Sequence, residues 1–321
     1  MTPPPAIPAA PHAAAPAAPP AAMSYRVHHH TVIQYAGLVR LAQFNLRLEP
    51  APWAGQVVTD YRLAIDPAPS AIRQDRGPFL VEERRLVLRE PIARLEITSS
   101  FCVTVAPPPV DYAAAASPPI AQIRRAALAS PDLSRMAPAS YLFSSPIAAH
   151  TPAIGAWASR FFGDDTPVIA ARQALMAAIH SELTYDADPT RTDTPAAEAF
   201  AKRHGVCQDF AHVLIVAARA HGIPAAYVSG YLRTLPPPGK PRLVGADAMH
   251  AWAALWCGDV LGWVGFDPTN DIFATTDHIF VAMGRDYSDV APLDGVFHGG
   301  GDQAMRVAVD VEPIAAAAIT D

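Results

Sequence analysis

Apolar and polar residues alternate in several short segments of the first third of the chain. In FNLRLEP (44–50), Phe44, Leu46 and Leu48 alternate with polar side chains, and the same period of two runs through DYRLAID (60–66), RRLVLRE (84–90) and ARLEITS (93–99). Successive side chains of a strand point to opposite faces, so this period indicates strands with one buried face. Residues 23–106 are therefore predicted to form a small antiparallel β-sandwich domain.

The spacing of apolar residues becomes helical after about residue 150. Two helices are predicted to start at the Thr-Pro pairs 166–167 and 194–195, because Pro is favoured at the first helical position. A third helix is predicted from Cys207 to the GIP terminator at 222–224. Strand patterns then follow at 226–232, 250–257, 262–268, 278–284 and 304–313. Helices followed by an antiparallel sheet predict an α+β second domain over residues 151–321.

Two segments are too rich in Pro and Ala to resemble either domain. Residues 107–150 are predicted to be a linker with one short helix around 119–130. Residues 1–22 are nearly all Pro and Ala, which predicts a disordered or polyproline-like extension, and Met23 is the more natural start of folded sequence.

Charge and cysteine content narrow the classes of function. The formal net charge is -6 and no basic run is present, so neither a nucleic acid nor an anionic membrane is expected as a partner. No apolar run reaches the roughly 18 to 20 residues that cross a bilayer. The 3 cysteines are widely spaced, which argues against a disulfide framework and fits a reducing compartment. We expect a cytoplasmic protein.

No metal or cofactor is expected. The consecutive His28, His29 and His30 cannot all meet one ion from a strand, so they are predicted to be surface residues. Cys207 and His212 form a C-x4-H pair without further ligands near by, and no loop has the spacing of an EF-hand calcium site.

Cys207 has two possible roles. A lone cysteine beside an apolar helix is usually a buried packing residue. However, Cys207 follows Gly205 at a predicted helix start, where the helix dipole and free N–H groups favour a thiolate and can stabilise an oxyanion. A thiol nucleophile also needs a general base and a group that orients that base.

The segment HAWAALWCGDVLGWVGFDPTN (250–270) can supply both groups from one β-hairpin. With a two-residue turn at 258–259, His250 lies opposite Asp267. With a loop over 258–261, Asp267 faces Trp252 and lies one diagonal step from His250. Every even-length loop keeps His250 and Asp267 on one face. The hairpin can therefore present an imidazole backed by a carboxylate.

The segments HGVCQDFAHVLIVAARAHGIPAAYVSGYL (204–232), DAMHAWAALW (247–256) and GWVGFDPTN (262–270) together resemble the core of the bacterial transglutaminase-like superfamily, a branch of papain-like thiol enzymes. The start of the chain, from YRVHHHTVIQY (25–35) to FCVTV (101–105), is similar to the N-terminal domain of bacterial members. The resemblance implies a papain-like, transglutaminase-like α+β catalytic core, with Cys207 as nucleophile, His250 as base and Asp267 as its orienter.

Three further residues are candidates for supporting roles. Gln208 could supply an amide near the oxyanion or could cap the helix. Tyr185 could support the site by packing or hydrogen bonding, and Trp252 shares the strand face of His250 and could line the cleft. The upstream tryptophan with which animal-type transglutaminases hold the oxyanion has no clear counterpart here, because Trp157 lies outside the matching region.

Such a triad supports acyl transfer through a thioester. Water as the acceptor gives a peptidase or amidase, which is the first choice, acting on a peptide or protein substrate. Transfer to a lysine amine would need a cleft that excludes water and docks the amine, and is the second choice. A non-catalytic peptide-binding scaffold is the alternative from another class. The oligomeric state is left open.

Overall fold

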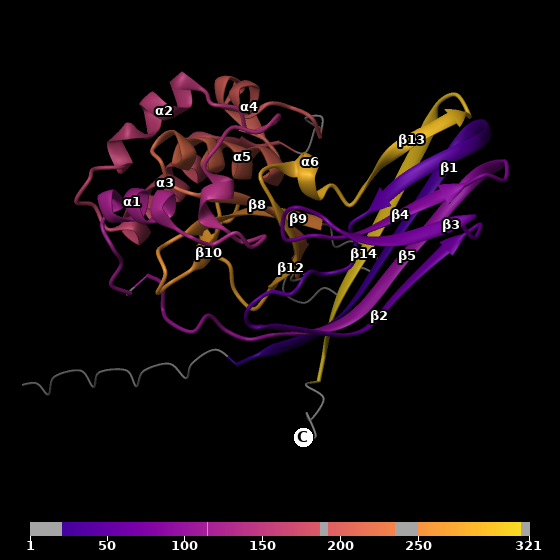
Figure 1. Ribbon diagram of the computed structural model, residues 1–321, viewed down its shortest axis with the longest axis horizontal. Coiled ribbons are helices and arrows are strands. Elements are labelled where there is room, and N and C mark those ends of the chain that lie inside the picture. Colours follow the sequence, from indigo (N-terminus) through magenta and orange to yellow (C-terminus); the bar gives the residue numbers. More distant parts are fainter. Residues whose placement is uncertain (1–20, 114, 187–191, 235–248, 316–321) are drawn as a thin grey trace, which may run out of the picture.

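The computed structural model describes residues 21–113, 115–186, 192–234 and 249–315. Within this part of the chain, two large antiparallel sheets form the two lobes of the molecule, and the helices gather in one of them (Figure 1). The predicted Pro/Ala-rich extension lies, up to residue 20, outside the described residues. No helix of the described residues is long and apolar enough to cross a membrane.

The first lobe is all β, as the alternating pattern predicts. Its strands are β1 (Met23–Leu46), β2 (Gln56–Asp66), β3 (Ala71–Arg76), β4 (Glu82–Leu88) and β5 (Ile92–Val105). They lie in the order β2-β5-β1-β4-β3. The alternating apolar residues of β1, β4 and β5 meet in one core that includes Phe44, Leu86 and Leu95. The core formed by β1, β4 and β5 holds the first lobe together, and β2 and β3 lie at the two ends of this strand order.

Two strands from the end of the chain complete this first sheet. The predicted strand 304–313 is present as β14 (Gln303–Ile314), but its assignment to the second sheet is wrong, because β14 pairs with β1 from Ser24↔Ile314 to Tyr35↔Gln303. A further strand, β13 (Leu293–Gly299), pairs with the other half of β1. The 24-residue length of β1 explains the difference, since its neighbours within residues 56–105 leave part of each edge open.

The second lobe is α+β, as predicted. Its sheet has the order β11-β10-β9-β8-β12, formed by β8 (Ala225–Leu232), β9 (Met249–Trp256), β10 (Trp263–Asp267), β11 (Ile272–Phe273) and β12 (His278–Gly284). Helices α3 (Val168–Glu182) and α5 (Cys207–Ala220) pack on the sheet (Figure 1). From Phe210 to Arg219 every residue of α5 is buried, so α5 is a central helix enclosed on all sides.

The predicted linker 107–150 packs into the second lobe. It contains the expected short helix, α1 (Ile120–Ala129), followed by the 3-10 turn η1 (Pro138–Tyr141). Ile120 and Tyr141 are fully buried. The remaining short elements are α2 (Pro152–Ala158), η2 (Ser159–Phe161), β6 (Thr184–Tyr185), α4 (Ala196–Lys202), β7 (His204–Gly205) and α6 (Tyr287–Val290).

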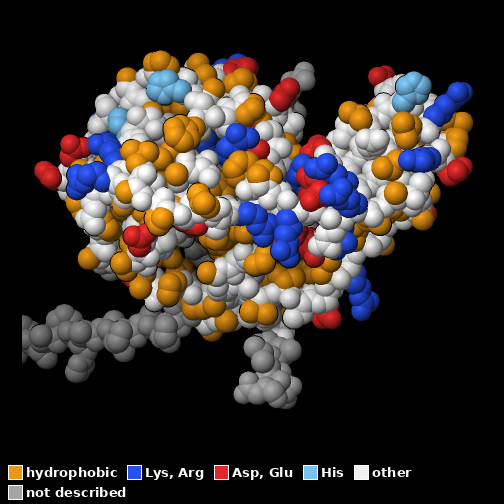
Figure 2. Space-filling model, viewed as in Figure 1, with side chains coloured by type: hydrophobic (Ala, Val, Ile, Leu, Met, Phe, Trp, Pro, Cys, Tyr) orange, Lys and Arg blue, Asp and Glu red, His pale blue; other side chains and the backbone are white. Residues whose placement is uncertain are grey.

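The two lobes share polar and apolar contacts. Arg47, directly after β1, is held by an ion pair with Glu83 of β4 at 2.7 Å and donates across the lobes to the carbonyl of Ala291, next to α6. Arg135 of the segment before η1 bonds Glu82 of β4 at 3.2 Å. Charged side chains gather where the lobes meet in the space-filling view (Figure 2). One apolar core also includes residues of both sheets, so the lobes pack as one body.

Candidate active site

The start of α5 fixes the position of Cys207. Short strands β6 and β7 pair in parallel and bring Tyr185 opposite Gly205, two residues before Cys207. The Asp209 carboxylate accepts the backbone N–H of Val206 at 2.9 Å and so caps the helix. A Cβ at Gly205 would lie 2.6 Å from that carboxylate, so only glycine fits this turn. Cys207 is the first helical residue, where N–H groups lack intrahelical acceptors.

The β9–β10 hairpin brings His250 and Asp267 together. Trp263 pairs with Trp256 and the N–H of Cys257 bonds the carbonyl of Gly262, so the loop spans 258–261, the second of the two predicted registers. His250 Nε2 lies 2.8 Å from Asp267 Oδ2. The Asp267 side chain is fully buried and that of His250 is 10% exposed. The predicted imidazole–carboxylate pair is present.

Burial and hydrogen bonding set the protonation of this pair. Burial alone would lower the pKa of His250, but hydrogen bonds with Asp267 and with Cys207 raise it to about 10. Burial alone would raise the pKa of Asp267, but hydrogen bonds from His250 and His278 hold it well below its usual range. His250 is therefore an imidazolium through the neutral range, and Nδ1 is the ring nitrogen left for Cys207, because Nε2 bonds Asp267.

This ion pair also stabilises the fold within a defined pH window. The raised pKa of His250 gives a stabilisation that is complete below the unfolded value of about 6.5 and is lost as the pH rises through about 10. The depressed pKa of Asp267 gives a stabilisation that starts to be lost as the pH falls below about 3.9.

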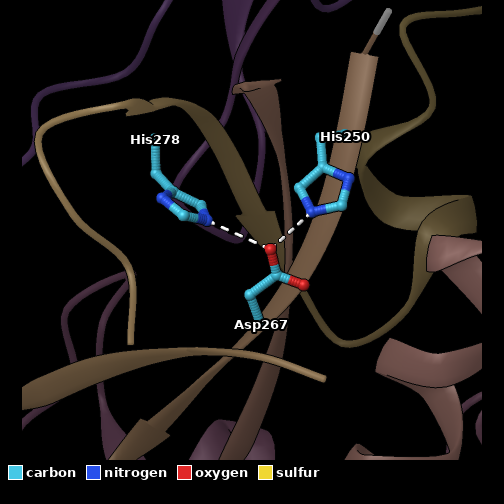
Figure 3. A group of neighbouring side chains, drawn as sticks. All are labelled: His250, Asp267 and His278. Atoms are coloured by element: carbon cyan, nitrogen blue, oxygen red, sulfur yellow. Dashed lines mark hydrogen bonds and ion pairs between the residues drawn. The ribbon is translucent and has the colours of Figure 1, made fainter. Parts of the chain in front are cut away.

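A second histidine, not singled out in the sequence, completes the surroundings of Asp267 (Figure 3). His278 Nε2 lies 3.2 Å from Asp267 Oδ2, and His278 Nδ1 accepts the N–H of Thr275 at 3.1 Å. An accepting Nδ1 places the proton on Nε2, so His278 donates to the carboxylate. The side-chain amide of Asn270 donates to the same oxygen at 2.7 Å. The carboxylate is therefore held by donors on several sides.

His250, Asp267 and His278 also have the composition of a metal-ligand set, with ligand atoms within 4.8 Å of one another. In the structure these atoms form hydrogen bonds with one another instead: both imidazoles are bonded through Nε2 to one oxygen of Asp267 (Figure 3). The local sequence gives no sign of this contact. His278 lies on β12, at the opposite edge of the sheet from β10 and β11.

The three predicted supporting residues differ in where they lie. Tyr185 is 55% exposed and packs edge-on against Phe210, and burial together with the charge of Cys207 raises the pKa of its phenol. It is therefore close to the thiol. The side-chain amide of Gln208 donates to the carbonyl of Thr192 at 2.6 Å, which ties α5 to the preceding loop. This bond occupies one of the two N–H donors of the amide.

The suggestion that Trp252 lines the cleft is wrong. Trp252 shares the strand face of His250, but only 3% of it is exposed. Its ring packs beside that of His250 and edge-on against His278, with ring centroids 6.1 Å and 5.2 Å apart. It reaches across Gly230, where a Cβ would lie 2.4 Å from the indole. Trp252 thus covers the His–Asp pair from inside the core.

Two histidines set aside in the sequence are buried. His29 was expected at the surface, yet it is 2% exposed and bonds the hydroxyls of Tyr231 and Thr31, each at 3.0 Å. Strand alternation explains this, since it exposes His28 and turns His29 inward. Burial lowers the pKa of His29 to about 4. His212 is fully buried, stacks on Tyr227 and accepts the N–H of Tyr287 at 3.2 Å.

Cys207 and His250 line one cleft of about 350 Å³. Gln208 and the aromatic residues Tyr227 and Tyr287 also line it, and the first lobe closes the opposite side with residues of β1 and β14. A cleft of this size is within the range of small-molecule and peptide side-chain sites. The arrangement places a thiol, an imidazolium and a helix start around one open space.

Comparisons with known proteins agree with this architecture. Residues 155–268 match the transglutaminase-like superfamily model, and residues 25–104 match the model of the bacterial transglutaminase-like N-terminal region. Uncharacterized proteins of Mycobacterium tuberculosis and Mycobacterium bovis are each 36% identical over 293 residues, which is 90% of this chain and 92% of theirs.

Two other matches have more informative names. A protein-glutamine gamma-glutamyltransferase of Pseudomonas aeruginosa is 34% identical over 108 residues, which is 31% of this chain and 16% of that protein. A crystal structure from Cytophaga hutchinsonii, described as a "Putative Cysteine Protease", covers 92% of both chains with a TM-score of 0.70 and 22% identity, and so shares the fold. From the matches to both family models and the mycobacterial relatives, we conclude that the chain belongs to the transglutaminase-like superfamily.

Proposed function

We propose that this protein is a thiol-dependent acyl-transfer enzyme that hydrolyses a peptide or isopeptide amide, with Cys207 as nucleophile, His250 as general base and acid, and Asp267 as the group that orients His250. The observation that carries the proposal is the series of a thiol at a helix start, an imidazole that lines the same cleft, and a buried carboxylate 2.8 Å from that imidazole. Each group has the chemistry that its role requires. The same series argues against a non-catalytic scaffold, which would have no use for it.

The reaction follows from the proton positions. The Cys207 thiolate attacks the amide carbonyl carbon, and the oxyanion is stabilised by N–H groups at the start of α5. The His250 imidazolium gives its Nδ1 proton to the leaving nitrogen, the C–N bond breaks, and a thioester remains. His250 then takes a proton from the attacking water, and collapse of the second tetrahedral intermediate releases the carboxylic acid and the thiolate. Asp267 keeps the imidazole in one tautomer throughout.

Water is the proposed acceptor because none of the described residues of the cleft lining supplies a carboxylate that could hold a lysine ammonium. The described residues that line the cleft include no Asp or Glu. Amine transfer is the second candidate, and the observation in its favour is the partial similarity to a relative named as a protein-glutamine gamma-glutamyltransferase. Transfer requires that the amine outcompete water at the thioester, which a docking site for the amine would promote.

Product analysis decides between the two acceptors. A peptide library is incubated with the protein and a labelled primary amine, and mass spectrometry follows both products. We expect new acid termini or glutamine-to-glutamate conversion, and no gain of the label. Prior treatment with iodoacetamide serves as the control. Incorporation of the amine in excess of acid would make the protein a transglutaminase.

The first prediction concerns the reactivity of Cys207. Of the three cysteines, Cys207 is the one that lines the cleft beside His250, and a thiol next to a histidine at a helix start is the kind that alkylates readily. Iodoacetamide is therefore expected to alkylate Cys207 at least about tenfold faster than Cys102 or Cys257. His250→Ala should remove this preference. Peptide mapping of the alkylated sites measures it. Equal labelling of Cys207 and Cys102, which is likewise partly exposed, would contradict the proposal.

The second prediction concerns His278. His278→Ala removes one donor to Asp267 and leaves the carboxylate freer to turn away from His250. Turnover is expected to fall by about 10- to 100-fold, the usual effect of losing a group that orients a functional residue. His278→Gln can still donate and should recover part of the rate. If both variants keep full turnover with unchanged thermal unfolding, His278 has no positioning role.

A further inference from the structure

The wall of the cleft opposite the thiol belongs to the first lobe. In the antiparallel pair β1–β14, His29 lies opposite Val309 and Thr31 opposite Val307. Directly opposed residues share a face of the sheet, so these side chains form one surface, and all four line the cleft. Met305, two residues before Val307, lines it as well. The end of the chain therefore contributes to the site that contains Cys207.

This wall, which we call the β14 wall (Met305, Val307 and Val309), is apolar and partly open to solvent. Met305 is 58% exposed and Val307 is 49% exposed, whereas Val309 is 1% exposed and anchors the strand. Met249 and Leu293 continue the apolar surface around the cleft. No Asp, Glu, Lys or Arg is among the cleft residues in the part of the chain that the structure describes. The His250 imidazolium also lines the cleft, but its charge is paired with the buried Asp267, so a charged segment would lose hydration there without gaining an unpaired partner among these residues.

The β14 wall is held at a fixed place relative to the thiol. His29 bonds Tyr231 of β8 at 3.0 Å, and the Tyr25 hydroxyl donates to Asp277, just before β12, at 2.6 Å. The side chain of Gln56 both donates to and accepts from the backbone of Phe280 at 2.9 Å. These bonds join the first sheet to the sheet that carries His250. The two sides of the cleft are therefore positioned together.

We propose that the β14 wall is the subsite for an apolar, extended segment of the substrate polypeptide next to the scissile amide, so that the enzyme selects acyl donors flanked by apolar side chains. The proposal rests on the proposed function of Cys207. Every second side chain of a strand points to the same face, with a spacing of about 6.8 Å. Met305, Val307 and Val309 have this spacing, and so do alternate side chains of an extended peptide, so the two can pack side chain against side chain. The described lining, in which the charge of His250 is already paired with Asp267, favours this occupant over a charged peptide.

Two matched irreversible probes test the subsite. Both are peptidyl chloromethyl ketones, in which the Cys207 sulfur displaces chloride; one has two leucines next to the reactive ketone, and the other has two aspartates. We expect the leucine probe to label Cys207 at least about tenfold faster, because the β14 wall removes its apolar side chains from water. Val307→Asp should reduce this ratio to near one or invert it.

Control variants distinguish an effect on the β14 wall from an effect on the reactivity of the Cys207 thiol. Val57→Asp changes a strand valine on β2 that is 60% exposed, somewhat more than Val307, and lies outside the cleft lining, so it should keep the wild-type ratio. Val307→Thr keeps the β-branched shape and should lower the ratio less than Val307→Asp, which covers the case that the aspartate variant misfolds. The rate of alkylation by iodoacetamide, which carries no peptide to bind the β14 wall, measures the reactivity of the Cys207 thiol in each variant.

The outcomes are distinct. Equal labelling by the two probes in the wild type, or an unchanged ratio in both Val307 variants, would overturn the subsite while leaving the thiol chemistry in place. Failure of iodoacetamide to prefer Cys207 would instead overturn the proposed function, and the subsite with it. A ratio that falls in the Val307 variants and not in Val57→Asp supports the β14 wall.

Discussion

Cys207→Ala is expected to lower turnover of any amide substrate by about four to six orders of magnitude. Without the sulfur no thioester forms, and the remaining helix N–H groups and His250 can only assist direct attack by water. Loss of a nucleophile from a triad costs about this much in related chemistry. The measurement is kcat/KM on a substrate found in the product analysis, with thermal unfolding as the check on folding.

The matched control for Cys207 is Cys102→Ala. Cys102 is also a free and partly exposed cysteine, but it lies on β5 of the first sheet. Its replacement should leave turnover within about twofold of the wild type, the range of a surface substitution away from a site. Cys207→Ser keeps the size of the side chain and should still be inactive, because a hydroxyl is far harder to ionise than a thiol. Retained activity in Cys207→Ala would end the proposal.

Asp267→Asn is expected to lower kcat by about three to four orders of magnitude, as in other triads in which the carboxylate becomes an amide. Asp267 accepts hydrogen bonds from both His250 and His278 through one oxygen. An amide cannot stabilise the imidazolium, and its N–H group would favour the tautomer in which His250 accepts at Nε2. The pKa of His250 should therefore fall from its raised value, which NMR titration of the imidazole measures.

Asp271→Asn is the control for this change. Asp271 is exposed and has a left-handed backbone with φ of 54°, a conformation that asparagine tolerates as well as aspartate. Asp271 lies four residues after Asp267. Its replacement therefore tests whether removing any negative charge near the site is enough to lower kcat. We expect kcat to change by less than about twofold. A similar loss in both variants would point to general electrostatics and away from a specific role of Asp267.

Much of the candidate site was predictable because its signals are local. The helix start at Cys207 follows from the change of pattern after Gly205, and His250 and Asp267 belong to one hairpin. An even-length loop was enough to place them on one face, and both even registers that were considered give that result. The helix and strand patterns likewise predicted α3, α5 and the longer strands of the second sheet. These features depend on residues close together in the chain.

The contacts that were missed depend on how separate elements pack against one another, which the pattern within one element does not record. His278 reaches Asp267 across the sheet, His29 faces inward because β1 lies against the second lobe, and Trp252 is covered by the core. The placement of β14 failed for the same reason. An alternating pattern indicates that a segment is a strand, but it does not specify which open edge that strand will fill.

The sequence by itself determined the two fold classes, the helix that begins with the thiol, and the hairpin that pairs an imidazole with a carboxylate. Only the tertiary structure decided which of two registers the hairpin adopts, which donors surround Asp267, and which strands face Cys207 across the cleft. The physical reason is that periodicity records which side of an element is buried, whereas the partner buried against it is selected by packing over the whole chain.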